Sequence, residues 1–335
     1  MVITNAAARV IDTIHQDPYE MIETIGRLCY KSEDKITEGS AVKFVTAMYN
    51  SNHHAMLEHY HVMLCLSPMS YEMIMSAIDD GEELLNTNLR KYLNITYKEL
   101  TPMIKMCYIS SSFRGFIDLL KVIGNTSSGH ALGSTLNNTF PELFPDYTFN
   151  PDTDAIHSIN ILPWDDFKEL IEDEEWLKSD EKKAILSKHI PITAIFRCDR
   201  GVSHELVRHR PASFGQESTR YCNYSNDKFS HSITFIKPFF FEDNSYQYNV
   251  WENACIESEK AYFALIDLGA TPQEARSVLH TSVKTEIGVT ATEAEWQHII
   301  NLRYHGTTGK PHPQMLEVME FVYPDICKLS EGRIK

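Results

Sequence analysis

The sequence predicts a fold of mixed helices and strands, of the α/β (α+β) class. Asp17 and Pro18 are suited to the start of a helix, and the apolar residues that follow them recur at helical spacing. Short runs rich in β-favouring residues, such as PITAIFRCD at 191–199, alternate with such helical segments. With 335 residues, 43% of them hydrophobic, the chain is long and apolar enough to bury a large core.

The remaining elements are predicted in order along the chain. Polar caps and glycine ends mark helices, whereas β-branched and aromatic runs mark strands. We expect helices over 17–32, 40–52, 70–81, 112–124, 201–210, 245–269, 271–283, 292–303 and 313–323. We expect strands over 59–67, 191–199 and 232–241, and Pro238 places the last of these at an edge or a bulge.

The composition changes between about residues 125 and 188. Gly, Ser, Asn and Pro come first, and two acidic helical segments follow at 164–179 and 180–189. Their acidic residues are typical of a solvated helix face. We therefore expect a single domain over 1–335 that carries a peripheral insertion at about 125–188.

The bulk composition excludes several classes of protein. A formal net charge of −15 disfavours general binding to nucleic acid, because duplex DNA would repel the protein at long range. No apolar run is long enough to cross a bilayer and the N-terminus does not resemble a signal peptide, so we expect a cytoplasmic protein without membrane contact. Seven scattered cysteines without a C-x-x-C pair argue against a zinc knuckle and a disulfide framework.

One segment carries a net positive charge, in contrast to the chain as a whole. Between Arg197 and Arg220 the chain has five arginines, opposed by three acidic residues. Within it, RHRPASFGQESTRY (208–221) combines guanidinium groups, hydroxyls and a bend at Pro211. Guanidinium groups bind oxyanions through paired hydrogen bonds, so this segment predicts a site for phosphate or a planar anion. The alternative is a surface cluster of ion pairs.

Two other functions compete on the same residues. A non-catalytic nucleotide- or RNA-binding module would use the arginines together with Tyr221, Tyr224 and Phe229 for stacking. A hydrolase would use Ser218 or Cys222 as nucleophile, although each needs a base or a lowered pKa. We interpret Cys222 as a packed cysteine and Ser218 as a hydrogen-bond donor to phosphate.

The spacing within this segment resembles the signature of the flavin-dependent thymidylate synthases. That signature is R-H-R, seven residues, S, and then R-Y, and it is matched here by Arg208, His209, Arg210, Ser218, Arg220 and Tyr221. Further segments are similar to motifs of the same family: RLCYKS (27–32), HHAMLEH (53–59), CDRGVSHELVRHR (198–210), EARSVL (274–279) and NLR (301–303). The resemblance covers about 17–95 and 190–327.

The resemblance implies a fold with a central, mostly antiparallel sheet flanked by helices, and a methyltransferase that converts dUMP to dTMP. Methylenetetrahydrofolate would give the carbon, NADPH would reduce FAD, and the protein would position these groups and stabilise charge. Self-association as a homotetramer is implied as well. The implied dUMP-binding residues are Glu205, Gln216, Ser218, Thr219, Arg220, Arg276 and Arg303, and the implied FAD-binding residues are His53, Glu58, Arg208, His209, Arg210 and His298. Arg220, Ser218 and His53 are the catalytic candidates.

The chain departs from the family pattern on the flavin side. Thr292 and Ala294 stand where an Asn and an Arg are common, and His298 stands where an Asn is common. A metal site among His53, His54, Glu58, His59 and His61 is conceivable, but neither H-E-x-x-H nor a cysteine partner is present, and we expect no metal.

Overall fold

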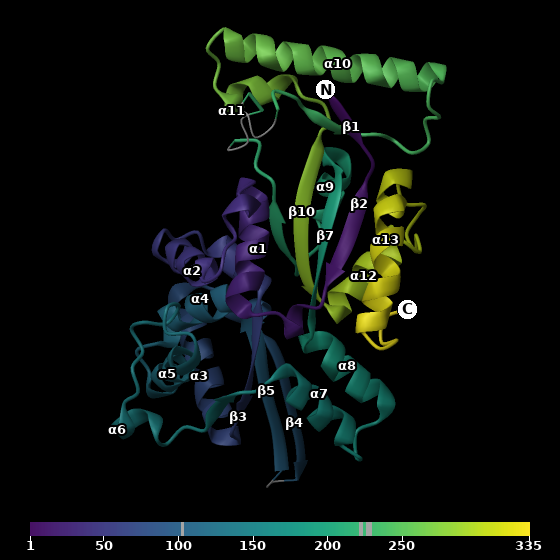
Figure 1. Cartoon of the computed structure of the whole chain (residues 1–335). Coiled ribbons are helices and arrows are strands. Elements are labelled where there is room, and N and C mark those ends of the chain that lie inside the picture. Colours follow the sequence, from purple (N-terminus) through teal and green to yellow (C-terminus); the bar gives the residue numbers. More distant parts are fainter. Residues whose placement is uncertain (102–103, 221–223, 226–229) are drawn as a thin grey trace.

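The computed structural model describes residues 1–101, 104–220, 224–225 and 230–335. Strands form two four-stranded antiparallel sheets and one two-stranded parallel sheet, and helices cover them (Figure 1). The predicted class of mixed helices and mostly antiparallel strands is confirmed. None of the helices in these ranges is both long and apolar enough to pass through a membrane.

The first four-stranded sheet carries the residues of the arginine-rich segment. Its order is β2 (Ala7–Ile11), β7 (Pro191–Asp199), β10 (Lys284–Thr292) and β8 (Ser213–Gln216). All three pairings are antiparallel, with Lys284 opposite Asp199 and Ile287 opposite Gln216. The sheet therefore brings the arginine-rich segment against a strand that lies about seventy residues further along the chain.

Helices pack on both faces of this sheet (Figure 1). On one face, α12 (Glu293–Arg303) and α13 (Pro313–Leu329) share a core with β7 and β10 that includes Phe196 and Trp296. On the other face, α1 (Pro18–Tyr30) lies against β8 and β10, because Gly215 and Gly288 leave room for Ile25. The sheet is thus buried on two sides, which explains why the first six residues of β7 are all buried.

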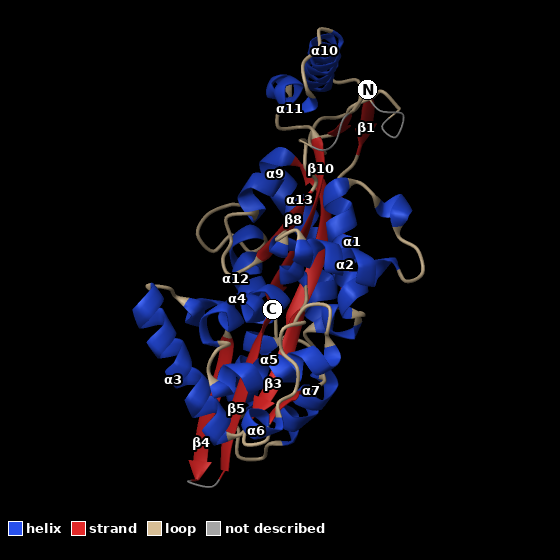
Figure 2. Ribbon diagram, turned by 90° about the vertical axis from the view of Figure 1, so that its left-hand side faces the viewer, coloured by secondary structure: helices blue, strands red, loops and turns tan. Residues whose placement is uncertain are grey.

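The second four-stranded sheet lies at one end of the molecule (Figure 2). Its order is β4 (Asn94–Thr101), β5 (Ile104–Ser112), β3 (His61–Leu66) and β6 (Ile159–Ile161). The helices around it are α2 (Ser40–Asn50), α3 (Pro68–Leu85), α4 (Phe113–Ile123), α5 (Ser127–Thr139), α6 (Pro151–Asp154), α7 (Trp164–Asp173) and α8 (Ser179–His189).

The segment 125–188 is packed into this second sheet. Its β6 pairs with β3, and Phe167 and Leu186 from α7 and α8 share a buried cluster with Met63 and Tyr108. The segment therefore contributes strand and core together, although we expected it to lie at the periphery. Its status as an insertion relative to the family, and the single-domain organisation, stay predictions.

The two-stranded sheet and a long helix lie together at one end of the molecule. β1 (Val2–Thr4) pairs in parallel with β9 (Thr234–Ile236), and α10 (Tyr246–Asp267) crosses beyond them (Figure 1). The helix predicted over 271–283 is shorter: α11 (Pro272–Ala275) ends in a 3-10 turn at Arg276–Val278, and the chain then enters β10.

Two local structures decide how the site is built. α1 begins as predicted, because the Asp17 carboxylate accepts hydrogen bonds from the backbone N–H groups of Tyr19 and Glu20. It ends at Lys31, which adopts the left-handed conformation with φ 49°. The end predicted for the helix over 201–210 is wrong, because α9 (Arg200–Leu206) stops before the R-H-R motif.

Candidate active site

The side chains around the arginine-rich segment form two groups, and the predicted site residues among them belong to the first. One group surrounds His209 and consists of Glu205, His209, Glu295, His298 and Arg303; we call it the His209 cluster. The other surrounds Glu217 and consists of Lys31, Glu217, Lys284 and Glu286; we call it the Glu217 cluster. β8 lies between them and is held in register by β10.

Arg303, the last residue of α12, binds the end of α9. Its Nε donates a hydrogen bond to His209 Nε2 at 3.0 Å, and its Nη1 donates to the Glu205 carboxylate at 2.5 Å. Its Nη2 lies 3.4 Å from the Glu205 carbonyl oxygen. One guanidinium thus joins Glu205 and His209, which the resemblance assigned to two different ligands.

Burial and charge keep His209 neutral. The side chain is 4% exposed, and burial, followed by the positive charge of Arg303, lowers the pKa of His209 to about 4. Because Arg303 donates to Nε2, the neutral ring carries its proton on Nδ1. That atom lies 3.9 Å from Glu295 Oε1, which is beyond hydrogen-bond distance.

Glu295 is a second unusual group in the His209 cluster. Its side chain is 9% exposed, and burial raises its pKa to about 7. Within the described ranges its Oε1 has no hydrogen-bond partner. A buried acceptor without a donor is costly, so this oxygen is open to a proton or to a polar N–H or O–H of a ligand.

His209, Glu295 and His298 could hold a metal ion by proximity alone, since their ligand atoms lie within 4.8 Å of one another. The hydrogen bonding disfavours it. The other nitrogen of a metal-bound His normally donates to an acceptor, whereas His209 Nε2 accepts from a guanidinium. The positive charge of Arg303 would also repel the cation. These residues therefore fit a hydrogen-bonding ligand better than a metal.

Arg208 and Arg210 lie on the exposed side of this turn. The Arg210 guanidinium donates to the carbonyl oxygens of Val207 and His209, both at 2.6 Å, and lies 5.1 Å from the centre of the Phe214 ring. Arg210 thus stabilises the turn itself, while Arg208 extends its charge into solvent.

The Glu217 cluster is a network of two cations and two carboxylates, in which Glu217 is buried and the other three side chains are partly exposed. Glu217 is 2% exposed, and its Oε2 lies 3.0 Å from Lys284 Nζ and 3.7 Å from Lys31 Nζ. Both lysines also contact the Glu286 carboxylate. Burial is the largest influence on Lys284 and lowers its pKa, which the Glu217 carboxylate partly offsets.

The predicted nucleotide-binding residues follow directly after Glu217. The Ser218 N–H donates to the Cys29 carbonyl at 3.1 Å, and the Ser218 hydroxyl lies 3.4 Å from the Arg220 N–H. Arg276 Nη1 donates to the Thr219 hydroxyl at 3.2 Å. The structure thus brings Arg276, Ser218 and Thr219 together, with an exposed Arg220 beside them.

Gln216 is engaged inside the protein. Its side-chain amide donates to the hydroxyls of Ser203 at 2.8 Å and Thr285 at 3.2 Å. Its amide N–H groups therefore fix β8 between α9 and β10, and a nucleotide contact would use the amide oxygen. Tyr221 and Cys222 lie outside the described residues.

The motif HHAMLEH lies beside β8. It forms a short 3-10 helix, η3 (His54–His59), and a Cβ added to Gly215 would lie 3.2 Å from His59 Nε2. His53 is exposed at the start of η3 and accepts or donates a hydrogen bond with the Tyr30 hydroxyl at 2.7 Å. Glu58 pairs with Arg114 at 2.7 Å. Through Tyr30 and Lys31, this motif adjoins the Glu217 cluster.

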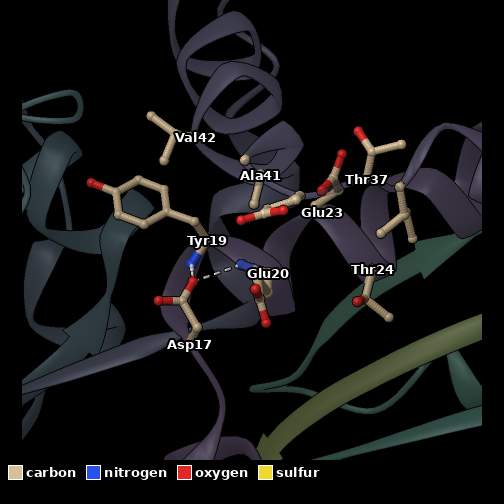
Figure 3. Close-up of a pocket in the computed structure, with 11 residues that line it drawn as sticks. Asp17, Tyr19, Glu20, Glu23, Thr24, Thr37, Ala41 and Val42 are labelled. Atoms are coloured by element: carbon tan, nitrogen blue, oxygen red, sulfur yellow. Dashed lines mark hydrogen bonds between the residues drawn. The ribbon is translucent and has the colours of Figure 1, made fainter.

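A surface pocket between α1 and α2 is a poor candidate for the anion site (Figure 3). Four carboxylates line it, from Asp17, Glu20, Glu23 and Glu38, and its lining includes none of the predicted site residues. In Figure 3, Asp17 is occupied by the N–H groups that start α1. The negative lining would repel a phosphate.

The fold and the site define an α+β protein with a cationic turn suited to anionic ligands. Residues 174–321 match the family model described as thymidylate synthase complementing protein. This match bears out the resemblance seen in the sequence, and the curated proteins to which the chain is similar are named flavin-dependent thymidylate synthases.

Three relatives illustrate the similarity, all named flavin-dependent thymidylate synthase. The Thermococcus onnurineus protein is 33% identical over 121 residues, which are 36% of this chain and 49% of the relative. The Pyrococcus abyssi protein is 29% identical over 169 residues, 47% and 68% of the two chains. The Geobacter sulfurreducens protein is 36% identical over 104 residues, 31% and 43% of the two chains. The chain thus spans about half the length of the curated relatives it matches.

Among solved structures, the chain is similar to a UMP/dUMP methylase PolB from Streptomyces cacaoi bound with 5-Br UMP. The TM-score is 0.39 at 20% sequence identity, over 50% of this chain and 84% of that chain.

Proposed function

We propose that the protein is a flavin-dependent thymidylate synthase that methylates dUMP to dTMP, with methylenetetrahydrofolate as the carbon donor and NADPH as the reductant of FAD. The observation that supports it most is the convergence of separated segments on the residues that flank β8. Arg276 reaches Thr219, Arg303 reaches His209, and Ser218 is bonded to the end of α1. These are the residues that match the family's motifs.

Two features of the His209 cluster and of the arginines beside it fit FAD. The exposed Arg208 and Arg210 offer positive charge to a diphosphate, and the free oxygen of Glu295 offers an acceptor to an N–H or O–H of the nucleotide. His209, His298, His53 and Glu58 complete the proposed set. When bound, the reduced flavin would supply the hydride for the reaction.

The nucleotide would be held by the residues around Ser218. Arg276, Ser218 and Thr219 would bind its phosphate, with Glu205, Gln216 and Arg303 as the further contacts implied by the resemblance. Arg220 would stabilise the negative charge that develops on the uracil carbonyl oxygens, a contribution of about 3 kcal/mol for a fixed donor. The protein's own work is thus orientation and charge stabilisation.

The competing functions have less support. Tyr224, one of the aromatic residues proposed to stack on RNA, is 5% exposed and packs in a core cluster with Tyr262 and Phe235. A hydrolase would need a base beside Ser218, and within the part of the chain that the structure describes its hydroxyl accepts from the Arg220 backbone N–H, which is not a base.

The proposal is tested by the absorption spectrum of the purified protein. We expect bound flavin, and bleaching of its absorbance when NADPH is added without oxygen, faster in the presence of dUMP. Formation of dTMP from labelled methylenetetrahydrofolate then completes the assay. A preparation that takes up no FAD and forms no dTMP would refute the proposed function. A mass measurement in solution tests the implied homotetramer, and the cytoplasmic location stays a prediction.

A further inference from the structure

Glu217 is the most enclosed charge of the Glu217 cluster, and it immediately precedes the residues proposed to bind dUMP. Its Oε2 accepts hydrogen bonds from Lys284 Nζ at 3.0 Å and from the backbone N–H of Glu286 at 3.2 Å. The side chain is 2% exposed, compared with 24% for Glu286. A carboxylate this enclosed lies inside the protein, where the substrate does not reach it.

The backbone of Glu217 is fixed as well. Its N–H donates to the Glu286 carbonyl at 2.8 Å, and its carbonyl accepts from Arg200 Nη2 at 3.2 Å. The next residue, Ser218, donates its N–H to Cys29. Side chain and main chain together therefore attach this point of the turn to β10, α9 and α1.

The charge of Glu217 is opposite to what a phosphate contact requires. In direct contact with dUMP it would repel the phosphate, but it neutralises Lys284 and contributes to neutralising Lys31. Lys284 Nζ and the Glu286 backbone N–H both donate to this carboxylate and so fix the start of the turn. The carboxylate therefore fixes the turn from inside the protein and does not contact the phosphate.

We propose that Glu217 is the positioning residue of the nucleotide loop, which we define as residues 218–220. By binding Lys284 and the Glu286 backbone, Glu217 holds Ser218, Thr219 and Arg220 in the orientation that receives dUMP. The inference rests on the proposed function and adds to it a residue that acts without touching the substrate.

The test compares three variants of the full-length, FAD-loaded protein in steady-state kinetics. Glu217→Met removes both acceptors of the carboxylate, and we expect the KM for dUMP to rise at least tenfold and kcat to fall, because Arg220 moves with the loop. Glu217→Gln keeps an oxygen that can accept from the Glu286 N–H, and we expect an intermediate rise. Both lysines still have Glu286 as partner in these variants, so the fold should survive.

Glu286→Gln is the matched control. Its carboxylate contacts the same two lysines, whereas its bonds to Glu217 come from its backbone, so we expect an unchanged KM for dUMP. Equal increases in KM for Glu286→Gln and Glu217→Met would overturn the proposal, as would a wild-type KM in Glu217→Met. If Glu217→Met does not fold, the same comparison between Glu217→Gln and Glu286→Gln decides.

Hydrogen exchange separates this inference from the proposed function. In the ligand-free protein, we expect the Ser218 amide to exchange at least tenfold faster in Glu217→Met than in the wild type, with the exchange of β7 unchanged. This measurement needs no dUMP. Wild-type protein that fails to bind dUMP would refute the proposed function, whereas unchanged exchange at Ser218 would refute the role of Glu217.

Discussion

At the scale of single residues, Arg303 shows how one side chain can serve two parts of a site. Its guanidinium has five N–H groups in a rigid fork, which suits simultaneous bonds to a carboxylate and a ring nitrogen. Here it binds Glu205 and sets the tautomer of His209. A lysine could not reproduce this arrangement, because its single ammonium cannot reach both partners in the same geometry.

We predict that Arg303→Lys weakens binding of both FAD and dUMP, each by about tenfold, a loss of about 1.4 kcal/mol. The physical reason is that His209 loses the donor to Nε2 and can rotate or change tautomer. Titration calorimetry with each ligand measures the effect. In Arg303→Lys the His209 ring remains buried, but the positive charge beside it lies in a different position. An NMR titration of His209 therefore reports whether its pKa stays close to 4. Loss of dUMP binding alone would contradict the bridging role.

At the scale of the secondary-structure elements, the contact between β8 and α1 joins the two halves of the site. Gly215 in β8 lies against Ile25, Cys29 and His59. A Cβ there would come within 2.4 Å of Ile25 Cγ2 and 3.1 Å of Cys29 Sγ. The absence of a side chain thus lets α1 and η3 approach the strand that follows the R-H-R motif.

We predict that Gly215→Ala destabilises the protein by about 1–3 kcal/mol, because an added methyl group overpacks this contact. The displaced α1 and η3 should also weaken flavin binding, since His53 lies at the start of η3. Urea unfolding and FAD titration measure the two effects. Ser213→Ala, in the same strand, is the control and should change both by much less. Wild-type stability in Gly215→Ala would show that this contact is not close.

The sequence was sufficient to predict some of these elements and not others. The start of α1 was predictable because its cap and first-turn proline are local, and β7 was predictable because it is rich in residues that favour strands. β10 was missed, although it lies in the middle of its sheet. Its Lys284 and Glu286 are polar residues in a buried strand, and their partners Lys31 and Glu217 are distant in the chain. Local patterns do not contain that information.

The candidate site was predictable to a similar extent. Motif spacing selected Arg208, Ser218, Arg220 and the two later arginines, because the resemblance depends on residue order alone. It did not select Glu295 or Glu217. Nothing in either residue's neighbourhood in the sequence marks it as special, and each becomes notable only through burial beside a distant cation or histidine.

At the scale of the whole molecule, buried histidines give the fold a dependence on pH. Burial lowers the pKa of His59 and His189 to about 3 and of His61 and His209 to about 4. His59 and His189 bond to hydroxyl groups, as in the bonds of His189 to Thr96 and Ser110 at 2.8 Å, and His209 faces Arg303. The folded protein therefore holds these rings neutral at pH values where the unfolded chain protonates them.

We predict that the free energy of unfolding falls as the pH drops from about 6.5 toward 4. Each of these histidines is protonated in the unfolded chain below its ordinary pKa of 6.5 and stays neutral in the folded protein, so each removes up to about 1.4 kcal/mol per pH unit in that window. Glu295 acts in the opposite direction. Its raised pKa, about 7, means that the folded protein binds this proton more tightly, which offsets roughly one histidine.

The measurement is urea unfolding at pH 7, 6 and 5, and His189→Gln supplies the internal comparison. This variant keeps a polar side chain between Thr96 and Ser110 but cannot be protonated, so its stability should fall less steeply with pH by about 1 kcal/mol per unit below pH 6. His305→Gln is the control, because that side chain is exposed and the slope should match the wild type. A stability that is flat from pH 7 to 5, or equal slopes for His189→Gln and the wild type, would mean that these rings titrate in the folded protein as they do in the unfolded chain.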